Sequence, residues 1–272
     1  MRILVRPPSP QDVDSWEPLG WREAPDFAWL AREHEAFRTL LGEAGAEVIE
    51  ARGEPGNLDS LYVYDPSLVT PDGGAILLRP GKDGRLGEPE ALRPDLEAAG
   101  LRILGRLEPP ATADGGDTVW LDETTLLVGR SYRTNDPGID TLRRLLPDVA
   151  VLAFDLPHMA GRGEVLHLRS LLSPLGDNAF VAHRPLLPAR LVELLERRDA
   201  EIVGVPADEV ETMGPNVLAI APRVIVALAG NDRTRGRLER AGFEVRVYEG
   251  DEISRKGDGG PTCLTLPLPA PA

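Results

Sequence analysis

A unit that recurs five times along the 272 residues is the feature that most limits the fold of this chain. In each unit an amphipathic stretch with helical spacing ends near a turn residue, and a short apolar run follows. The helical stretches lie at 30–41, 92–99, 139–146, 189–198 and 234–241, and the apolar runs at 46–49, 101–104, 149–152, 200–203 and 242–245. Gly45, Gly100 and Gly242 separate helix from strand in three units, as expected for the residue that most easily closes a helix. The spacing of roughly 45 to 55 residues indicates a repeated supersecondary unit.

Each unit also contains strand-like runs before its helix, for example 61–63 with 75–78, 118–121 with 126–128, and 217–220 with 224–228. Such units could stack as a solenoid or close into a ring, and strand-helix alternation alone also fits an ordinary open α/β sheet. The run 3–5 would complete the last unit, whose chain stops near Leu268, and terminal strands that share a unit favour the ring. Because no linker or break in composition is visible, we expect residues 1–272 to form a single domain.

Composition limits the partners and the location. No run approaches the roughly 18 apolar residues of a membrane helix, and the apolar part of MRILVRPPSP is too short for a signal peptide. The single cysteine excludes an intramolecular disulfide and a cysteine-built zinc site, and it fits a reducing compartment. The formal net charge of −14 disfavours nucleic acid and anionic membranes and would favour a cationic ligand. We expect a cytoplasmic protein without a nucleic-acid or membrane partner, and a homodimer is left open.

Motifs for common cofactors are missing from the sequence, which contains no P-loop, no GxGxxG after a strand and no HExxH. Polar residues do occur at corresponding places in the units, roughly 15 to 20 residues after each apolar run. They are Asp65 in YVYDP, Asp114 and Asp117 in ADGGD, His167 in VLHLRS, Asn216 in GPNVLAI and Cys263 in GGPTCLTL. If the units are related by rotation about an axis, these side chains would converge at one end of the ring and share one pocket.

Cys263 and His167 are the candidates for nucleophilic chemistry. A lone cysteine is most often a small buried hydrophobe, but Cys263 follows a Gly-Gly-Pro turn that would deliver its thiol from a loop at the start of a strand. His167 lies in the alternating run 165–169, where a histidine is commonly satisfied in the core or exposed. A cysteine paired with a histidine is the usual means of forming a thiolate nucleophile. Asp65 interrupts an apolar run, where an unpaired acid is costly.

Six segments, in order along the chain, resemble the dimethylarginine dimethylaminohydrolases of the guanidine-modifying (pentein) superfamily, which also contains arginine deiminases and amidinotransferases. The segments are DSLYVYD (59–65), LLRPGKDGRLGE (77–88), ADGGD (113–117), SYRTN (131–135), VLHLRS (165–170) and SRKGDGGPTCLTL (254–266). They span almost the whole chain, and HLRS, RTN and DGGxTCL are specific in combination, although none would suffice alone. The resemblance implies an α/β fold, namely a five-bladed α/β propeller built from pseudo-repeated strand-strand-strand-helix units.

The resemblance also implies which residues carry the reaction. Cys263 would be the nucleophile and His167 the proton donor and general base, while Asp65 and Asp114 would grip the substrate guanidinium. A guanidinium is delocalised and unreactive, so its charge must be held and its carbon oriented before a thiolate can add. The amine leaves only when protonated, which is the task of the histidine. Neither a cofactor nor a metal is implied.

Three further matches would hold the rest of a small cationic guanidino substrate, with Arg85 and Arg133 on its α-carboxylate and Asp59 on its α-amino group. The implied enzyme is a cysteine-dependent amidine hydrolase. It would cleave a guanidinium C–N bond of methylarginine or a related arginine derivative through a covalent thiouronium on the cysteine. The products would be citrulline, or an analogous ureido compound, and an amine.

Two positions depart from the family pattern. Asp114 stands where the family usually has Glu, and a carboxylate shortened by one methylene reaches about 1.5 Å less far. Tyr64 stands where an acid is usual. Arg169 stands where the deiminases and amidinotransferases usually have an acid, which favours the hydrolase. The alternatives that stay open are an amidinotransferase or deiminase acting on an arginine-like substrate, and a guanidinium-binding homologue that has lost turnover.

Overall fold

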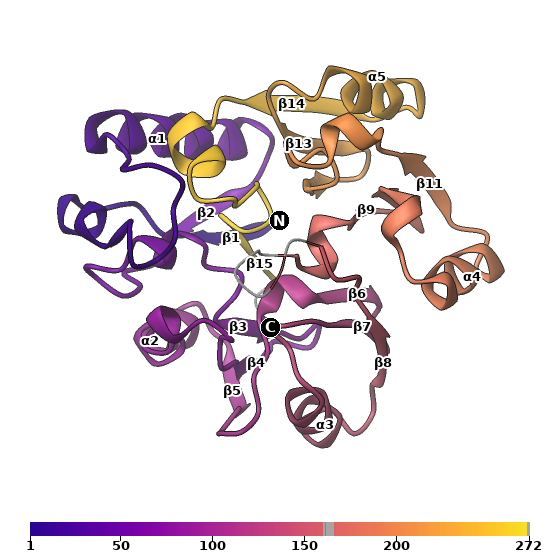
Figure 1. Cartoon of the computed structure of the whole chain (residues 1–272), viewed down its shortest axis with the longest axis horizontal. Coiled ribbons are helices and arrows are strands. Elements are labelled where there is room, and N and C mark those ends of the chain that lie inside the picture. The colour runs from indigo at the N-terminus through magenta and orange to yellow at the C-terminus, as the bar shows by residue number, and fades with distance from the viewer. Residues whose placement is uncertain (160, 162–165, 271–272) are drawn as a thin grey trace.

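In the part of the chain that the structure describes, the strands form five separate three-stranded sheets. The computed structural model describes residues 1–159, 161 and 166–270. Figure 1 shows the sheets arranged around a common centre, with the helices on the outside of the ring. This is the five-bladed α/β propeller that the sequence predicts. Within the described residues, no helix has both the length and the apolar character needed to cross a membrane.

Every blade repeats one pattern, in which the middle strand pairs antiparallel on one side and parallel on the other. In the first blade, β1 (Arg2–Val5) pairs antiparallel with β15 (Leu266–Leu268) and parallel with β2 (Glu47–Glu50). A parallel neighbour requires a crossover, and α1 (Phe27–Glu43) supplies it. The second blade contains β3 (Ser67–Val69), β4 (Gly74–Leu77), α2 (Glu88–Ala98) and β5 (Arg102–Arg106), and the third contains β6 (Thr118–Asp122), β7 (Thr125–Arg130), α3 (Asp136–Leu145) and β8 (Ala150–Asp155). The fourth contains β9 (Leu172–Gly176), β10 (Ala179–Ala182), α4 (Ala189–Arg197) and β11 (Glu201–Gly204). The fifth contains β12 (Val217–Ala221), β13 (Val224–Leu228), α5 (Asp232–Arg240) and β14 (Glu244–Tyr248).

The two ends of the chain meet in the first blade. Leu4 of β1 is paired with Leu266 of β15, and Ile3 with Pro267. The expectation that the terminal strands share a unit is therefore confirmed. Because the last strand completes the first blade, the five blades close into a ring and do not extend as a solenoid (Figure 1).

The helices cover the sheets with the faces that their sequences predict. In α1, Leu30, His34, Phe37 and Leu41 are buried. Each falls three or four residues after the previous one, so they share one face of the helix. Three helices are followed by glycines in the left-handed region, with φ of +94° at Gly45, +91° at Gly100 and +87° at Gly242, which matches the helix ends expected from the sequence.

Two local predictions need correction. The run 61–63 is not a strand, because the chain forms a 3₁₀ turn at Leu58–Leu61 and the first strand of that blade is β3. Residues 61–64 are all buried, so the run lacks the alternation of an edge strand with one solvated face. Around His167, Val165 lies outside the described residues, and Leu168–Ser170 form a 3₁₀ turn where a strand was predicted. His167 caps this turn, and its backbone N–H donates to Ser170 Oγ at 3.1 Å.

Candidate active site

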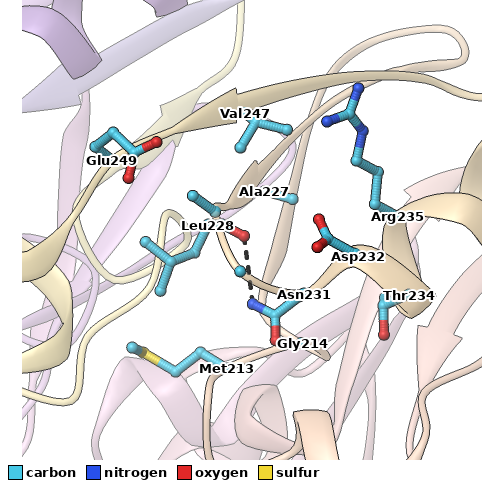
Figure 2. A pocket seen from close by; sticks show the side chains of 12 residues that line it. Met213, Gly214, Ala227, Leu228, Asn231, Asp232, Thr234, Arg235, Val247 and Glu249 are labelled. Carbon is cyan, nitrogen blue, oxygen red and sulfur yellow. Dashed lines mark hydrogen bonds between the residues drawn. The ribbon is translucent and has the colours of Figure 1, made fainter.

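The pockets of the molecule differ in the chemistry they offer. A small pocket of about 270 Å³ lies between β13, β14 and the start of α5. Figure 2 shows Asp232 and Arg235 on one side of it and Glu249 on another, with Asn231 Nδ2 donating to the carbonyl oxygen of Leu228 at 3.3 Å. Neither a cysteine nor a histidine lines it. The pocket therefore lacks a nucleophile of the kind the sequence predicts.

A larger pocket, of about 780 Å³, is lined by both Cys263 and His167. Loops from distant parts of the chain form its wall and contribute Leu19, Lys82, Gly116, Arg133, Asn216 and Gly257. The expected convergence of a thiol, an imidazole and an amide thus takes place in this pocket. The thiol and the imidazole come from two different loops, so closure of the ring is what brings them together.

The loop that carries Cys263 is fixed by close backbone packing. The backbone N–H of Cys263 donates to the carbonyl oxygen of Gly260 at 3.0 Å. A Cβ added to Gly260 would lie 2.5 Å from the side chain of Asn216. Asn216 Oδ1 accepts from the backbone N–H of Thr262 at 3.0 Å, and its Nδ2 lies 3.7 Å from the Cys263 sulfur. Asn216 therefore ties the loop to the next blade and presents a weak donor to the sulfur.

His167 is held by a buried carboxylate. Its Nε2 lies 3.0 Å from Oδ2 of Asp114, which has no exposed surface. Oδ1 of Asp114 accepts from the backbone N–H of Gly81 at 2.7 Å. On the other side the ring lies against Gly116, where an added Cβ would be 2.4 Å from His167 Nδ1. Asp114 thus orients the imidazole and leaves Nδ1 as the nitrogen next to the pocket wall.

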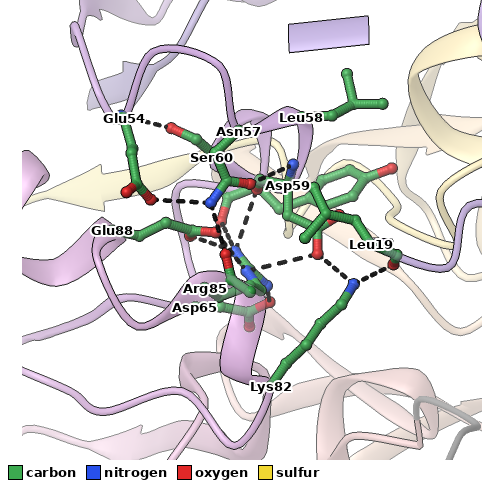
Figure 3. Close-up of polar contacts among 12 residues, drawn as sticks. Leu19, Glu54, Asn57, Leu58, Asp59, Ser60, Asp65, Lys82, Arg85 and Glu88 are labelled. Carbon is green, nitrogen blue, oxygen red and sulfur yellow. Dashed lines mark hydrogen bonds and ion pairs between the residues drawn. The ribbon is translucent and has the colours of Figure 1, made fainter. Parts of the chain in front are cut away.

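Behind this wall lies a buried cluster of charges around Arg85, drawn in Figure 3. Arg85 donates to Asp65 Oδ2 at 2.5 Å and makes two bonds of 2.7 Å to the carboxylate of Glu88. Asp65 Oδ1 accepts from the backbone N–H of Gly116 at 2.8 Å. Arg85 is 4% exposed and does not line the pocket. In this structure it positions Asp65, and a contact between Arg85 and a substrate carboxylate would require it to leave these partners.

Of the three residues expected to hold the far end of a substrate, only Arg133 lines the pocket. Its NH1 lies 3.7 Å from Asp114 Oδ2, and its side chain is 11% exposed. Asp59 is buried, and its carboxylate accepts from Trp21 Nε1 at 2.8 Å and from Lys82 Nζ. Lys82, which the sequence did not single out, stands between Asp59 and the pocket.

Known proteins match this architecture over its whole length. A family model described as arginine deiminase matches residues 187–269. An N(G),N(G)-dimethylarginine dimethylaminohydrolase of Pseudomonas aeruginosa is 29% identical over 97% of this chain and 98% of its own length, and one of Streptomyces coelicolor is 28% identical over 98% and 96%. A solved structure of the Pseudomonas aeruginosa protein, a cysteine-to-serine mutant complexed with citrulline, has a TM-score of 0.78 at 27% identity, covering 97% of this chain and 98% of that one. Over nearly its whole length the chain is thus similar to dimethylarginine dimethylaminohydrolases, and it has the five-bladed fold of the pentein superfamily.

The surroundings of His167 favour its protonated form at neutral pH. Burial by itself would lower the pKa of His167, but the hydrogen bond to Asp114 and the negative charges of Asp117 and Asp65 outweigh burial and raise the pKa to about 9. Burial opposes ionisation of Asp114 as well, yet the bond to His167 and its charge hold the pKa of that carboxyl below its usual value. The pair is therefore an imidazolium and a carboxylate.

The thiol of Cys263 is not ionised in the unliganded site. Burial and the negative charge of Asp65 raise its pKa to about 11, although bonds from Gly260 and Asn216 act in the opposite direction. The sequence led us to expect a thiolate formed by a cysteine-histidine pair. These pKa values favour a neutral thiol beside a protonated imidazole, so a cationic ligand would help to lower the pKa of the thiol.

Sequence reasoning missed several groups of the site, for different reasons. Glu88 follows Arg85 by three residues at the start of a helix, a spacing that brings side chains together. That signal could have identified the pair. Lys82 is one of several charged residues in a polar loop, and nothing in its neighbourhood distinguishes it. Tyr64, one of the two departures from the family pattern, lies under the guanidinium of Arg169, which is 4.3 Å from the ring centroid and donates to the tyrosine hydroxyl at 2.6 Å.

Proposed function

We propose that this chain hydrolyses a guanidinium C–N bond in methylarginine or a related arginine derivative, giving citrulline, or an analogous ureido product, and an amine. One observation carries the proposal. Cys263 and His167 line the same pocket, and the buried carboxylates of Asp65 and Asp114 lie directly behind its wall, bonded to Gly116 and His167. A nucleophile, a proton donor and two anions for a cation are the groups that this reaction needs.

The first step is addition of the Cys263 sulfur to the guanidinium carbon. A guanidinium attracted by the negative charge of Asp65 behind the wall brings a positive charge to the thiol and favours the thiolate. The substrate thus activates its own nucleophile, and the thiol proton leaves to solvent. Because Asp114 keeps His167 protonated, the acid needed for the next step is already in place.

The second step is loss of the amine, and water then releases the product. The Nδ1 proton of His167 passes to the leaving nitrogen, which departs as a neutral amine and leaves a thiouronium on Cys263. The neutral imidazole takes a proton from water, and the oxygen adds to the same carbon. The C–S bond breaks, the thiolate is restored, and the protonated ureido group gives its extra proton to solvent. No oxidant or reductant is consumed.

Arg133 supports recognition of the far end of the substrate, because its guanidinium lines the pocket and suits a carboxylate. A cytoplasmic location, a single domain and the absence of a cofactor stay predictions from the sequence. Whether the chain forms a homodimer also stays open.

The experiment is to incubate the purified protein with dimethylarginine, arginine and agmatine, each with and without glycine or lysine. Ureido product formed without an added amine supports hydrolysis. A new guanidino compound formed only when glycine or lysine is present would identify an amidinotransferase. Thermal stabilisation by these ligands without any product would identify a binding protein.

Mass spectrometry of the protein quenched during turnover tests the covalent step. We expect a mass increase on the peptide that contains Cys263. The Cys263→Ser variant should lose turnover and the adduct while its substrate affinity stays within about tenfold of wild type, because the hydroxyl is a far weaker nucleophile than a thiolate. Turnover of that variant at the wild-type rate would show that the nucleophile is misassigned.

A further inference from the structure

The ammonium group of Lys82 occupies a polar recess in the wall of the active-site pocket. Its Nζ donates to the backbone carbonyl oxygen of Leu19 and to Oδ2 of Asp59, as Figure 3 shows. Leu19 and Lys82 both line the pocket, and 22% of the Lys82 side chain is exposed. The protein therefore provides a cation of its own at this place, held from behind by an acid.

Asp59 is left with little capacity for a ligand. Its side chain is 4% exposed, Oδ1 accepts from Trp21 Nε1 at 2.8 Å, and Oδ2 accepts from Lys82 and lies 3.8 Å from Arg85 Nε. A substrate ammonium could reach the carboxylate only by displacing Lys82. An ammonium that stopped next to Lys82 would meet a like charge in a partly buried site, where such repulsion is weakly screened.

The neighbouring wall is also cationic. A Cβ added to Gly81 would lie 2.6 Å from the Cα and the carbonyl oxygen of Arg133, so the loop that carries Lys82 packs directly on Arg133. Both side chains line the pocket. Two cations on one wall favour a negatively charged group on the ligand.

The acids that the structure describes in the pocket lining do not offset this wall. Among the described residues two acids line the pocket, Glu211 and Asp258, and both are exposed. Asp258 is bound by Arg22 at 2.7 Å. An exposed carboxylate in water gives a ligand ammonium little binding energy. The buried acids Asp65 and Asp114 lie instead behind Gly116 and His167, at the end of the pocket that holds the reactive groups.

We propose that Lys82 takes the place of a substrate α-ammonium group, so that the preferred substrate is an ω-guanidino carboxylic acid without an α-amino group. This inference rests on the proposed function and narrows its substrate class. The guanidinium would lie at Cys263, and the carboxylate would lie between Lys82 and Arg133. Water would supply the oxygen of an ω-ureido acid, and ammonia or an amine would leave.

Three substrates that differ by one group separate the possibilities: arginine, 5-guanidinopentanoate, which lacks only the α-amino group, and agmatine, which lacks only the carboxylate. We expect kcat/KM for 5-guanidinopentanoate to exceed that for arginine by about tenfold or more, because an unpaired buried ammonium is strongly disfavoured. Agmatine should be the poorest substrate, because it gives Lys82 and Arg133 no anion.

The Lys82→Met variant removes the cation and keeps most of the side-chain stem. Leu19 and Asp59 then become free to accept from the ammonium of arginine. We expect the ratio of kcat/KM for 5-guanidinopentanoate to that for arginine to fall by about tenfold or more. Lys82→Arg, which keeps the charge, and Glu211→Gln, which alters an exposed acid of the pocket, should leave the ratio within about threefold of wild type. Because the ratio is taken within one preparation, a partial loss of folding cancels.

Calorimetric titration of the Cys263→Ser variant with the same compounds makes the test independent of turnover. Tighter binding of 5-guanidinopentanoate than of arginine, with no ureido product from any compound in the wild type, would retain this inference and reject the proposed function. Ureido product formed with arginine preferred, and a ratio that Lys82→Met leaves unchanged, would retain the proposed function and overturn this inference. A ratio that responds to Glu211→Gln and not to Lys82→Met would also overturn it.

Discussion

Nε2 of His167 lies 3.0 Å from Oδ2 of Asp114, and the two side chains are 7% and 0% exposed. A carboxylate at this place does two things for the imidazole. It fixes the ring so that Nδ1 lies against Gly116 in the pocket wall. It also keeps the ring protonated, so that the acid needed to expel an amine exists before the substrate arrives.

The contact makes folding stability depend on pH. The pKa of His167 rises from 6.5 to about 9 on folding, so the folded state binds the proton more tightly than the unfolded chain. Its contribution is fully present below pH 6.5 and is lost as the pH rises toward 9. From the size of the shift this loss amounts to about 3 kcal/mol.

Urea unfolding at pH 6, 7.5 and 9 measures the effect, with His167→Gln as the comparison. The free energy of unfolding of the wild type should fall more steeply over this range than that of the variant. Glu88, whose pKa burial raises to about 7, titrates in both proteins and cancels in the difference. Equal slopes for the two proteins would contradict the pH-dependent role of the pair.

Replacing Asp114 with Asn should separate the effect of its negative charge on His167 from the effect of its shape. The amide is nearly isosteric and can still accept a hydrogen bond from His167, but the negative charge is lost. We expect the pKa of His167, followed by NMR, to fall by more than one unit, and kcat at pH 7.5 to fall by about a hundredfold, because general acid catalysis by a positioned histidine is worth at least that much. The Asp122→Asn variant, at a partly exposed carboxylate on β6 that pairs with Arg198, should change neither quantity. An unchanged pKa of His167 in Asp114→Asn would disprove the charge effect.

Substitution of Gly116 should lower activity by displacing a side chain of the site. A Cβ at this position would lie 2.4 Å from His167 Nδ1 and 3.1 Å from Asp65 Oδ1, so Gly116→Ala must displace the imidazole or the carboxylate. Displacements of about 1 Å in positioned groups can cost about a hundredfold in rate, which is the decrease in kcat that we expect. Gly42→Ala is the matched control, because Gly42 lies inside α1 with nothing within 4 Å of the added atom. Full activity in Gly116→Ala would mean that the ring does not work from this position.

The sequence predicts the elements whose signals are local. All five helices and the strand that follows each one lie where periodicity and terminal glycines place them. The first strand of the second blade is predicted wrongly, because residues 61–64 are all buried and their apolar pattern resembles that of a strand. His167 was expected on a strand and instead caps a 3₁₀ turn, where its backbone N–H bonds Ser170. Neither arrangement is visible until distant loops are packed together.

The site likewise contains features that the sequence predicts and features that it does not. The motifs single out Cys263 and His167 as the candidates for nucleophilic chemistry, and the structure brings both to one pocket. The motifs are not sufficient to distinguish a side chain that faces the pocket from one that lies behind it. Asp59, Asp65, Arg85 and Asp114 were all expected to touch substrate, and all four are buried behind the wall, whereas Lys82 lines the pocket. That difference depends on which side of a folded loop each residue occupies.

The cluster around Arg85 gives a prediction in which stability and activity respond differently. Arg85 is bonded to two buried carboxylates, so Arg85→Met leaves Asp65 and Glu88 without their cation. Breaking a buried ion pair in this way costs about 3 to 5 kcal/mol of unfolding free energy. The matched control is Arg93→Met on α2, the helix that begins at Glu88; the exposed pair of Arg93 with Glu90 should contribute less than about 1 kcal/mol. Adding Glu88→Leu to Arg85→Met removes one stranded acid and should recover part of the stability in urea unfolding. It should not recover kcat, because Asp65 still lacks the bond that positions it.

Recovery of both quantities would mean that Arg85 has no positioning role. A loss of stability in Arg85→Met no larger than that in Arg93→Met would mean that the cluster does not stabilise the fold.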